Sequence, residues 1–206
     1  SEAISSGTRT TNPIETGSGM TIGSTSTDFS QGSITIGTDL DIAISGEGFF
    51  QVSSSSSEFD KNATKLLTRS GSFLVDSSNT FIVDNFGRKV YGFPLNKNGN
   101  VTATTVEPIQ TKSFNKVAFT DGGTLVGDPD SDSPIPLYKI GLTSVQNKEG
   151  LIASSGGAYK QSIASGKLFE TKGAGETISN NSASTYGDVL SKSLEGSNVD
   201  IAKVAL

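Results

Sequence analysis

Three aspartates at alternate positions, Asp128, Asp130 and Asp132, form a pattern that could hold a calcium ion. This spacing lets successive carboxylates converge on one cation in a calcium-binding loop. The rest of such a loop is missing, because Ser133 stands where the turn needs glycine and Lys139 stands where a bidentate glutamate would follow. We therefore interpret the segment as a solvated acidic loop and predict no metal site.

Most other catalytic chemistry is excluded by two missing residue types. The chain contains no histidine and no cysteine. Without histidine the usual Ser-His-Asp and Cys-His nucleophile arrangements cannot form. Zinc sites lose both of their preferred ligand types, and disulfides are impossible. The sequence thus leaves carboxylates as the main candidates for acid and base chemistry.

A glycosidase-type pair of carboxylates would need two acids held across a cleft. The nominal candidates are Asp39, Asp41, Glu47 and Glu58. Acids that border strands usually form a solvated face or protect a sheet edge, so we predict that none is catalytic. The protein is therefore predicted not to be an enzyme and to need no cofactor.

Two further motifs carry little weight. Gly46-Glu-Gly48 is only the opening of a glycine-rich phosphate motif, and Phe49-Phe50 follows where a helix would have to begin, so nucleotide binding is not expected. Asn62-Ala-Thr and Asn180-Asn-Ser match the N-glycosylation pattern at the frequency expected by chance.

The elements around these residues are predicted to be short strands. Leu40, Ile42 and Ile44 alternate with smaller or polar residues, which indicates a strand with one apolar face. The glycine turn then leads into a strand that begins with Phe49 and Phe50. Neighbouring strand residues point to opposite faces, so one ring should enter the core and the other should cover a different part of the molecule.

More strands and turns follow the same pattern. Strands are predicted at 20–22, 65–67, 72–75, 81–83 and 88–93, with turns at 76–79 and 84–87. The run Ser53 to Ser57, with Glu58 and Asp60, is predicted to be a loop, and residues 1–27 are predicted to be extended. Frequent turns between short strands favour an all-β fold, an antiparallel sandwich or barrel-like domain with long hairpins and extended termini.

Composition supports a polar structural domain better than a nucleic-acid-binding protein. The 206 residues include 24 glycines, and only 33% are hydrophobic. The net charge of −5 and the absence of a basic patch argue against binding to nucleic acid. No apolar run is long enough to span a bilayer, so no membrane insertion is predicted.

Several blocks of sequence, in the same order, resemble the axial proteins of the bacterial flagellar hook and rod. They are Asp28-Phe-Ser-Gln-Gly32, Asp39-Leu-Asp-Ile-Ala-Ile-Ser-Gly-Glu-Gly-Phe-Phe50, Leu67-Thr-Arg-Ser-Gly-Ser-Phe73, Phe81 to Pro94, Tyr138-Lys-Ile-Gly-Leu142, Asn147-Lys-Glu-Gly-Leu151, Tyr159 with Ser165-Gly166, and Leu194-Glu-Gly-Ser-Asn-Val-Asp-Ile201. Within these blocks we interpret Gly46, Gly48, Phe49, Phe50, Arg69, Gly71 and Phe73 as core and turn residues rather than direct contacts between subunits.

The resemblance implies a structural subunit that stacks with identical subunits into a helical tube and transmits motor torque to the filament. The Leu194 to Ile201 block favours the hook or the distal rod, and Tyr138-Lys-Ile-Gly-Leu142 with Ser197-Asn-Val-Asp-Ile201 resembles the hook version more, so the hook is favoured over the distal rod. The same resemblance implies neighbouring rod, hook-cap or hook-filament junction proteins, and an extracellular location in the hook or basal body after export without a cleaved signal peptide. Family members carry long terminal helices, so we expect this sequence to be a core fragment and the isolated fragment to be monomeric.

The resemblance also implies a division of the chain. Residues 1–95 and 137–206 are expected to form one discontinuous β-domain, and 96–136 a small insertion in place of an outer domain. The compact insertion leaves the distal rod protein as an alternative. From the residues alone, a secreted adhesin or carbohydrate-binding β-sandwich also stays open, and it would need exposed tyrosines to stack on sugars. A carboxylate-only glycosidase is the enzyme alternative.

Overall fold

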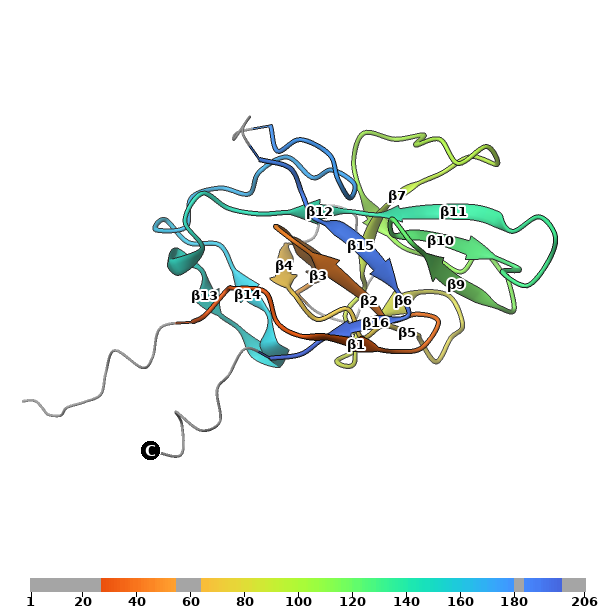
Figure 1. The fold of residues 1–206 in the computed structure, drawn as a ribbon, viewed down its shortest axis with the longest axis horizontal. Coiled ribbons are helices and arrows are strands. Elements are labelled where there is room, and N and C mark those ends of the chain that lie inside the picture. Colours follow the sequence, from red (N-terminus) through yellow and green to blue (C-terminus); the bar gives the residue numbers. More distant parts are fainter. Residues whose placement is uncertain (1–26, 55–63, 180–183, 198–206) are drawn as a thin grey trace, which may run out of the picture.

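The computed structural model describes residues 27–54, 64–179 and 184–197 (Figure 1). Every strand pairing in these ranges is antiparallel. The structure therefore confirms the predicted all-β class. The predicted strand at 20–22, most of the extended N-terminal segment and most of the serine-rich loop lie outside the described residues.

A first five-stranded sheet, here called the inner sheet, lies near the first and last described segments (Figure 1). Its strands, in the order in which they pair, are β12 (Leu142–Thr143), β3 (Phe49–Ser53), β4 (Lys65–Thr68), β14 (Tyr159–Lys160) and β13 (Ile152–Ala153). Two single-turn 3-10 helices, η3 (Lys148–Gly150) and η4 (Ser155–Gly157), flank β13. The edge strands of this sheet are only two residues long, which limits pairing with other chains.

A second five-stranded sheet, here called the outer sheet, occupies the other end of the long axis (Figure 1). Its strands, again in pairing order, are β8 (Glu107–Pro108), β7 (Tyr91–Pro94), β11 (Ile135–Ile140), β10 (Thr124–Gly127) and β9 (Val117–Thr120). A register shift between Leu125 and Val126 interrupts the pairing of β10 with β11. Such an irregularity bends the strand and increases its twist.

Three two-stranded ladders complete the described fold. They are β15 (Asp188–Ser191) with β2 (Ile42–Ser45), β5 (Leu74–Val75) with β6 (Ile82–Val83), and β1 (Ile34–Ile36) with β16 (Ser193–Glu195). The last ladder joins the first described segment to the last one. Chain segments about 160 residues apart in sequence are thus held side by side.

Both large sheets contribute to one apolar core. Phe50 and Leu66 from the inner sheet and Phe119, Leu125 and Ile140 from the outer sheet all belong to the same cluster. The rings of Phe50 and Phe73 meet edge to face with their centroids 5.4 Å apart, a favoured geometry for aromatic pairs. The shared core makes the two sheets parts of one packed unit.

The strand that alternates apolar and small residues is buried on both faces. Ile42, Ala43 and Ile44 are each 0% exposed, so the face that carries Ala43 is covered as well as the apolar one. The two phenylalanines separate as predicted. Phe50 enters the main core, whereas Phe49 belongs to a smaller cluster with Leu67.

The predicted turns are present. The amide of Asn79 donates to the carbonyl of Asp76, and the amide of Gly87 donates to the carbonyl of Asp84. Slight burial opposes ionisation of Asp76, but backbone hydrogen bonds from Thr80 and Phe81 lower the pKa of its carboxyl below the ordinary value. The side chain thus stabilises the turn as an anion.

Several strand boundaries differ from the predictions. The strand predicted at 72–75 is shorter, because Ser72 makes only an isolated bridge to Asp41 before β5 begins. Likewise β7 starts at Tyr91, and residue 90 makes only an isolated bridge to Val52. Ser53 was predicted to be in a loop but ends β3, because its hydroxyl accepts a hydrogen bond from the buried backbone of Lys89.

The segment predicted to be an insertion, 96–136, supplies β8, β9, β10 and the start of β11. These strands pair with β7 and with the rest of β11, which lie in the predicted main domain. Sequence reasoning assigned no strands here because the segment is rich in turn residues. Its division from the main domain stays a prediction, although continuous backbone pairing joins the two parts.

Candidate functional site

The charged side chain of Arg69 lies at the centre of a network that we call the terminal junction, made of Gln31, Gly32, Gly46, Gly48, Arg69 and Glu195. The Arg69 guanidinium binds Glu195 with both carboxylate oxygens, at 2.8 Å from Nε and 2.9 Å from Nη2. Its Nη1 donates to the carbonyls of Gly46 and Gly48, each at 2.8 Å. This two-oxygen geometry is the strong form of an arginine–carboxylate pair.

The carboxylate of Glu195 also binds the first described segment of the chain. The side-chain amide of Gln31 donates to Oε2 at 2.7 Å, and the backbone amide of Gly32 donates to the same oxygen at 2.8 Å. Only 5% of the Glu195 side chain is exposed. Its negative charge is therefore compensated by one arginine and two further donors, as a buried charge requires.

The glycine turn between β2 and β3 aims its carbonyls at Arg69. Gly46 and Gly48 have φ values of 125° and 128°, a region in which a side chain is strained. The turn is also tied to the first segment, because the amide of Gly46 donates to the side-chain oxygen of Gln31 at 3.0 Å. Glycine at these two positions thus lets the turn present two acceptors to one guanidinium.

A close backbone contact fixes the end of β4 beside this turn. A Cβ atom added to Gly71 would lie 1.8 Å from the carbonyl oxygen of Ile42. The amide of Ile42 donates to the carbonyl of Gly71 at 3.1 Å, so the two chains approach as closely as backbones can. This contact holds Arg69, two residues earlier, against the carbonyl of Ile44, which its Nη2 binds at 3.0 Å.

Aromatic packing also attaches the segment around Phe29 to the inner sheet. Phe29 contacts the ring of Phe49 at 5.9 Å and that of Tyr159 at 5.2 Å between centroids, both near edge to face. Phe49 and Leu67 are buried in the same cluster. The block around Asp28 to Gly32 is therefore attached by ring packing as well as by the hydrogen bonds of Gln31 and Gly32.

A second ion pair lies beside the glycine turn. The carboxylate of Glu47 binds Lys148 at 2.7 Å and the hydroxyl of Ser144 at 2.6 Å. Burial alone would raise the pKa of Glu47, but hydrogen bonds from Lys148 and Ser144, together with the charges of Lys148 and Arg69, lower it below the ordinary value. Glu47 therefore stays ionised and connects the turn to η3.

A hollow borders the junction. It measures about 350 Å³ and is lined in part by Phe29, Arg69, Tyr159 and Glu195. Three charged residues line it, and two of them, Arg69 and Glu195, pair with each other. Arg69 and Glu195 already use several of their donors and acceptors within the protein, so the pair has a structural role here. What the arrangement does is join four separate sequence blocks at one point.

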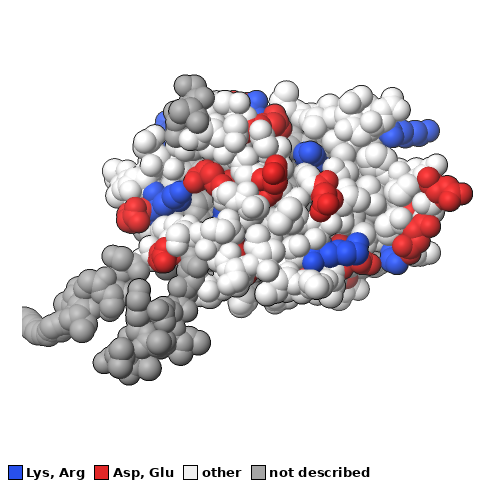
Figure 2. Space-filling model, in the orientation of Figure 1, with Lys and Arg blue, Asp and Glu red and all other residues white. Residues whose placement is uncertain are grey.

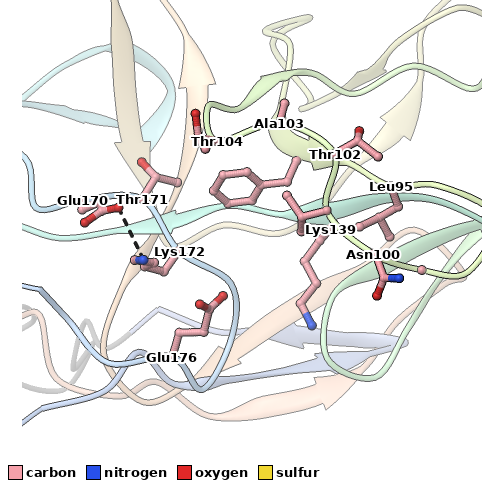
Figure 3. A pocket seen from close by; sticks show the side chains of 13 residues that line it. Leu95, Asn100, Thr102, Ala103, Thr104, Lys139, Glu170, Thr171, Lys172 and Glu176 are labelled. Carbon is pink, nitrogen blue, oxygen red and sulfur yellow. Dashed lines mark ion pairs between the residues drawn. The ribbon is translucent and has the colours of Figure 1, made fainter.

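A larger hollow lies between the loop after β7 and the segment 170–176 (Figure 3). It measures about 610 Å³, and Lys139, Glu170, Lys172 and Glu176 contribute its charges. Figure 3 shows the carboxylate of Glu170 turned toward Lys172, with 3.4 Å between Oε2 and Nζ. Glu176 accepts from the amide of Gly173 at 2.8 Å.

One carboxylate of this hollow, Glu170, lacks the property of a glycosidase general acid. Hydrogen bonds from Ser179 and Lys172 lower its pKa below the ordinary value. A general acid in such an enzyme needs a raised pKa.

The four acids considered from sequence are scattered or already paired. Asp41 is buried and accepts from both the amide and the hydroxyl of Thr38, at 2.7 Å and 2.9 Å. Asp39 pairs with Lys192 at 3.4 Å, Glu47 is paired as described above, and Glu58 lies outside the described residues. Each of the three described acids, Asp39, Asp41 and Glu47, thus has a partner of its own.

The alternating aspartates also separate. Asp130 pairs with Lys116 at 2.5 Å, and its side chain is 77% exposed. Among the residues that the structure describes, no three acidic side chains come close enough together to hold a metal ion. Within the same residues, no helix is long and apolar enough to span a membrane.

The tyrosines do not form a sugar-stacking surface. Tyr91, Tyr138 and Tyr186 are at most 1% exposed, and Tyr159 packs against Phe29. Burial raises the pKa of Tyr186 to about 12. Since all four tyrosines are inside or against the core, the adhesin alternative lacks the feature that would have supported it.

Sequence reasoning placed Arg69, Gly46, Gly48, Gly71 and the three phenylalanines in one set, and the structure places them around β2, β3 and β4. It missed Gln31 and Glu195 as partners of Arg69. Glu195 is 126 positions away from Arg69, and nothing local indicates such a contact. The signal that could have found it is the presence of both residues in the quoted blocks.

Comparison with known proteins gives relatives of two kinds. The flagellar basal-body rod protein FlgG of Buchnera aphidicola subsp. Baizongia pistaciae is 28% identical over 193 residues, which cover 92% of this chain and 63% of that protein. The rod protein FlgG of Bacillus subtilis is 28% identical over 80% of this chain and 53% of its own length. No protein-family model matches the chain.

Hook proteins match over shorter stretches. The flagellar hook protein FlgE of Helicobacter mustelae is 40% identical over 84 residues, which cover 40% of this chain and 17% of that protein. The hook protein FlgE of Rhizobium meliloti is 30% identical over 50% of this chain and 28% of its own length. The chain therefore spans less than two thirds of the length of each of these relatives.

Proposed function

We propose, on the premise that these matches support membership of the flagellar hook and rod family, that the chain is a structural subunit of the bacterial flagellar axial assembly. In this proposal identical subunits pack into a helical tube that transmits torque from the motor to the filament. The hook is the first candidate, supported by the 40% identity with one hook protein. Neighbouring axial proteins are its partners, and the flagellum outside the cell is its location.

The observation that carries the proposal is the terminal junction. One arginine and one glutamate join the first described segment, the glycine turn, the end of β4 and the last described segment. A subunit that transmits torque must pass force from its terminal segments into its globular part without separating them. A two-oxygen arginine–glutamate pair with only 5% exposure of the glutamate gives a directional connection suited to that task.

The rod is the second candidate, and a different observation favours it. The two rod proteins align with 92% and 80% of this chain, whereas the two hook proteins align with 50% and 40%. The compact segment 96–136, which is built into the outer sheet, agrees with a subunit that lacks a separate outer domain.

Electron microscopy of the full-length gene product, incubated under assembly-promoting salt, tests the proposal. We expect tubular polymers, straight for a rod subunit and curved for a hook subunit. The 206-residue chain serves as the control and is expected to form no tubes. A full-length product that remains monomeric at every salt and protein concentration would overturn the proposal, and a glycan-binding screen would then address the adhesin alternative.

A further inference from the structure

Exposed apolar side chains in the described part of the chain are concentrated rather than scattered. Six large ones are exposed, and they are Ile36, Leu74, Phe86, Val101, Ile152 and Ile163. Phe86 is partly covered by the guanidinium of Arg88, 5.0 Å from its ring centre. Single exposed apolar residues need no explanation, but four of the others fall into two pairs.

The first pair borders a hollow of about 490 Å³, which we call the concave patch, made of Ile36, Leu40, Leu74, Val75 and Phe114. Leu40, Leu74, Val75 and Phe114 line the hollow, and Leu74 is 41% exposed. Ile36 is 93% exposed and precedes the lining residue Thr38 by two positions. The two charged residues of the lining, Asp39 and Lys116, already have ion-pair partners.

The second pair forms a protruding surface, which we call the convex patch, made of Ile152 and Ile163. Ile163 is fully exposed, and Ile152 lies on the edge strand β13. The turn that carries Ile163 is held by reciprocal hydrogen bonds, since the amide of Ser162 donates to the hydroxyl of Ser165 at 2.8 Å and the amide of Ser165 donates to the hydroxyl of Ser162 at 3.1 Å.

That turn is also fixed to the neighbouring edge. The hydroxyl of Ser162 donates to the carbonyl of Gly150 at 2.5 Å, and the side-chain amide of Asn147 donates to the carbonyl of Ala164 at 3.1 Å. The turn therefore presents an apolar side chain in a preorganised position. A rigid projection loses little conformational freedom on binding, which favours a binding role over a role in solvent alone.

Charges near the two patches are complementary. The acidic loop with Asp128, Asp130 and Asp132 adjoins the concave patch, because the amide of Asp128 donates to the carbonyl of Lys116. Figure 2 shows acidic side chains gathered at this end of the molecule, on the loop between β10 and β11. Lys160 and Lys167 flank the convex patch, and both are exposed, against one nearby exposed acid, Glu149.

The two patches lie toward opposite ends of the long axis. β13 and β14, next to the convex patch, are at the left in Figure 1, whereas β5 and β9, next to the concave patch, are toward the right. A projection at one end and a hollow at the other cannot satisfy each other within one molecule. Between copies they give a head-to-tail contact, which repeats without closing and so builds a helical array.

We propose that the convex patch of one copy packs into the concave patch of a second copy, with Lys160 and Lys167 facing the acidic loop of that copy. The contact rests on the proposed function, since it names the surface through which the axial subunits would associate. Ile163 enters the hollow bordered by Leu74, and the opposite charges set the register. Apolar burial supplies most of the affinity, while the charges accelerate and orient association.

Disulfide crosslinking provides the direct test, because the chain has no native cysteine. The variants Ile163→Cys and Leu74→Cys are made in the full-length product, mixed at high protein concentration and oxidised. We expect a crosslinked heterodimer in good yield. Val101→Cys, which places a thiol at an exposed position outside both patches, replaces either partner as the control. A yield no higher than with the control overturns the contact.

Substitution provides a second test that does not depend on thiol geometry. Ile163→Asp changes a fully exposed residue, so the monomer should fold normally. We expect it to weaken self-association at least about tenfold, as measured by sedimentation, because an aspartate cannot enter an apolar hollow. Val101→Asp should leave association unchanged. Equal loss in both variants, or in neither, would contradict the proposal.

The results separate this contact from the proposed function. If the unmodified full-length product forms tubes but Ile163→Asp forms them equally well, the contact fails and the proposed function stands. If the unmodified product forms no tubes and the thiols still crosslink selectively, the contact stands and the proposed function fails. Reversal of Asp130 to lysine should weaken association, and Lys167→Glu in a mixed partner should restore it.

Discussion

The terminal junction and the outer sheet are stabilised by different interactions. At the junction, Arg69 donates six hydrogen bonds, two of them to the carboxylate of Glu195. They hold together the first described segment, the glycine turn and the last described segment. In the outer sheet, Phe119, Leu125 and Ile140 are at most 1% exposed, and the ion pair nearest to β9 is the exposed one between Lys116 and Asp130.

This difference separates local from global stability. Apolar burial is non-directional and is lost when the whole core opens, so it sets the free energy of unfolding. The hydrogen bonds and the ion pair of the terminal junction are directional. Their loss can separate the β1–β16 ladder while the core remains folded. The junction therefore governs how the terminal segments are attached, whereas the shared apolar core, to which the outer sheet contributes, governs whether the domain is folded.

The largest effect is expected in the core. Phe119→Ala removes a ring that packs against Phe73 with centroids 6.5 Å apart, and the site cannot collapse fully. We expect the free energy of unfolding to fall by about 3 to 5 kcal/mol. Chemical denaturation should show one cooperative transition with a lower midpoint. Separate transitions for the two sheets would contradict their sharing one core.

A smaller and more local effect is expected at the junction. Glu195→Gln removes the charge that compensates Arg69, whose side chain is 21% exposed. We expect a loss of about 2 kcal/mol, less than for a fully buried pair because solvent reaches the guanidinium. Hydrogen exchange should rise most at the backbone amides of β1 and β16.

A matched control sharpens this result. Glu149→Gln removes one exposed acid and should change neither stability nor the exchange of β1. The double variant Arg69→Met with Glu195→Leu leaves no unpaired charge, so it should regain stability relative to Glu195→Gln. Uniformly faster exchange across both sheets in Glu195→Gln would show that the junction is part of the global core.

Acid should weaken the contact between the glycine turn and η3. The pKa of Glu47 is lowered in the folded state, so its stabilising contribution is present above the ordinary carboxyl value and is lost as the pH falls through the folded value. The side chains of Glu47 and Lys148 are both about one third exposed, so we expect the free energy of unfolding to fall by less than about 1 kcal/mol. In Glu47→Gln the free energy of unfolding should depend less on pH in the range where Glu47 titrates. An unchanged dependence would contradict the stabilising role of the Glu47 carboxylate.

No stability effect is expected at the surface pair. A hydrogen bond and the charge of Asp130 raise the pKa of Lys116, but 52% of the lysine side chain and 77% of the aspartate side chain are exposed. Lys116→Ala should leave the denaturation midpoint of the monomer unchanged within error. A measurable loss would mean that the outer sheet, too, depends on a polar contact.

Local sequence patterns were sufficient for much of the inner half of the fold. The alternation from Leu40 to Ile44 predicted β2, and the adjacent phenylalanines predicted a division between two clusters that the structure confirms. Turn chemistry predicted the bends at 76–79 and 84–87. In each case the pattern itself is local, although the partners of β2, Phe49 and Phe50 lie far along the chain.

The outer sheet and the junction could not be predicted in the same way. Val117 to Gly127 holds a tight hairpin whose apolar runs are short and broken by glycines, so local patterning did not indicate β9 and β10. The pairing of Arg69 with Glu195 depends on the two chain segments being brought together by the β1–β16 ladder. Such contacts are set by topology, which a single sequence encodes only indirectly.

The β1–β16 ladder has a mechanical consequence. Its strands are antiparallel, and residues 27 and 197 leave it on the same side, beyond the pairing of Ile34 with Glu195. Tension applied outward through both ends would peel the ladder apart one pair at a time instead of shearing all pairs at once. Glu195 belongs to the first pair that would open, so its salt bridge with Arg69 must break before the rest of the ladder can separate.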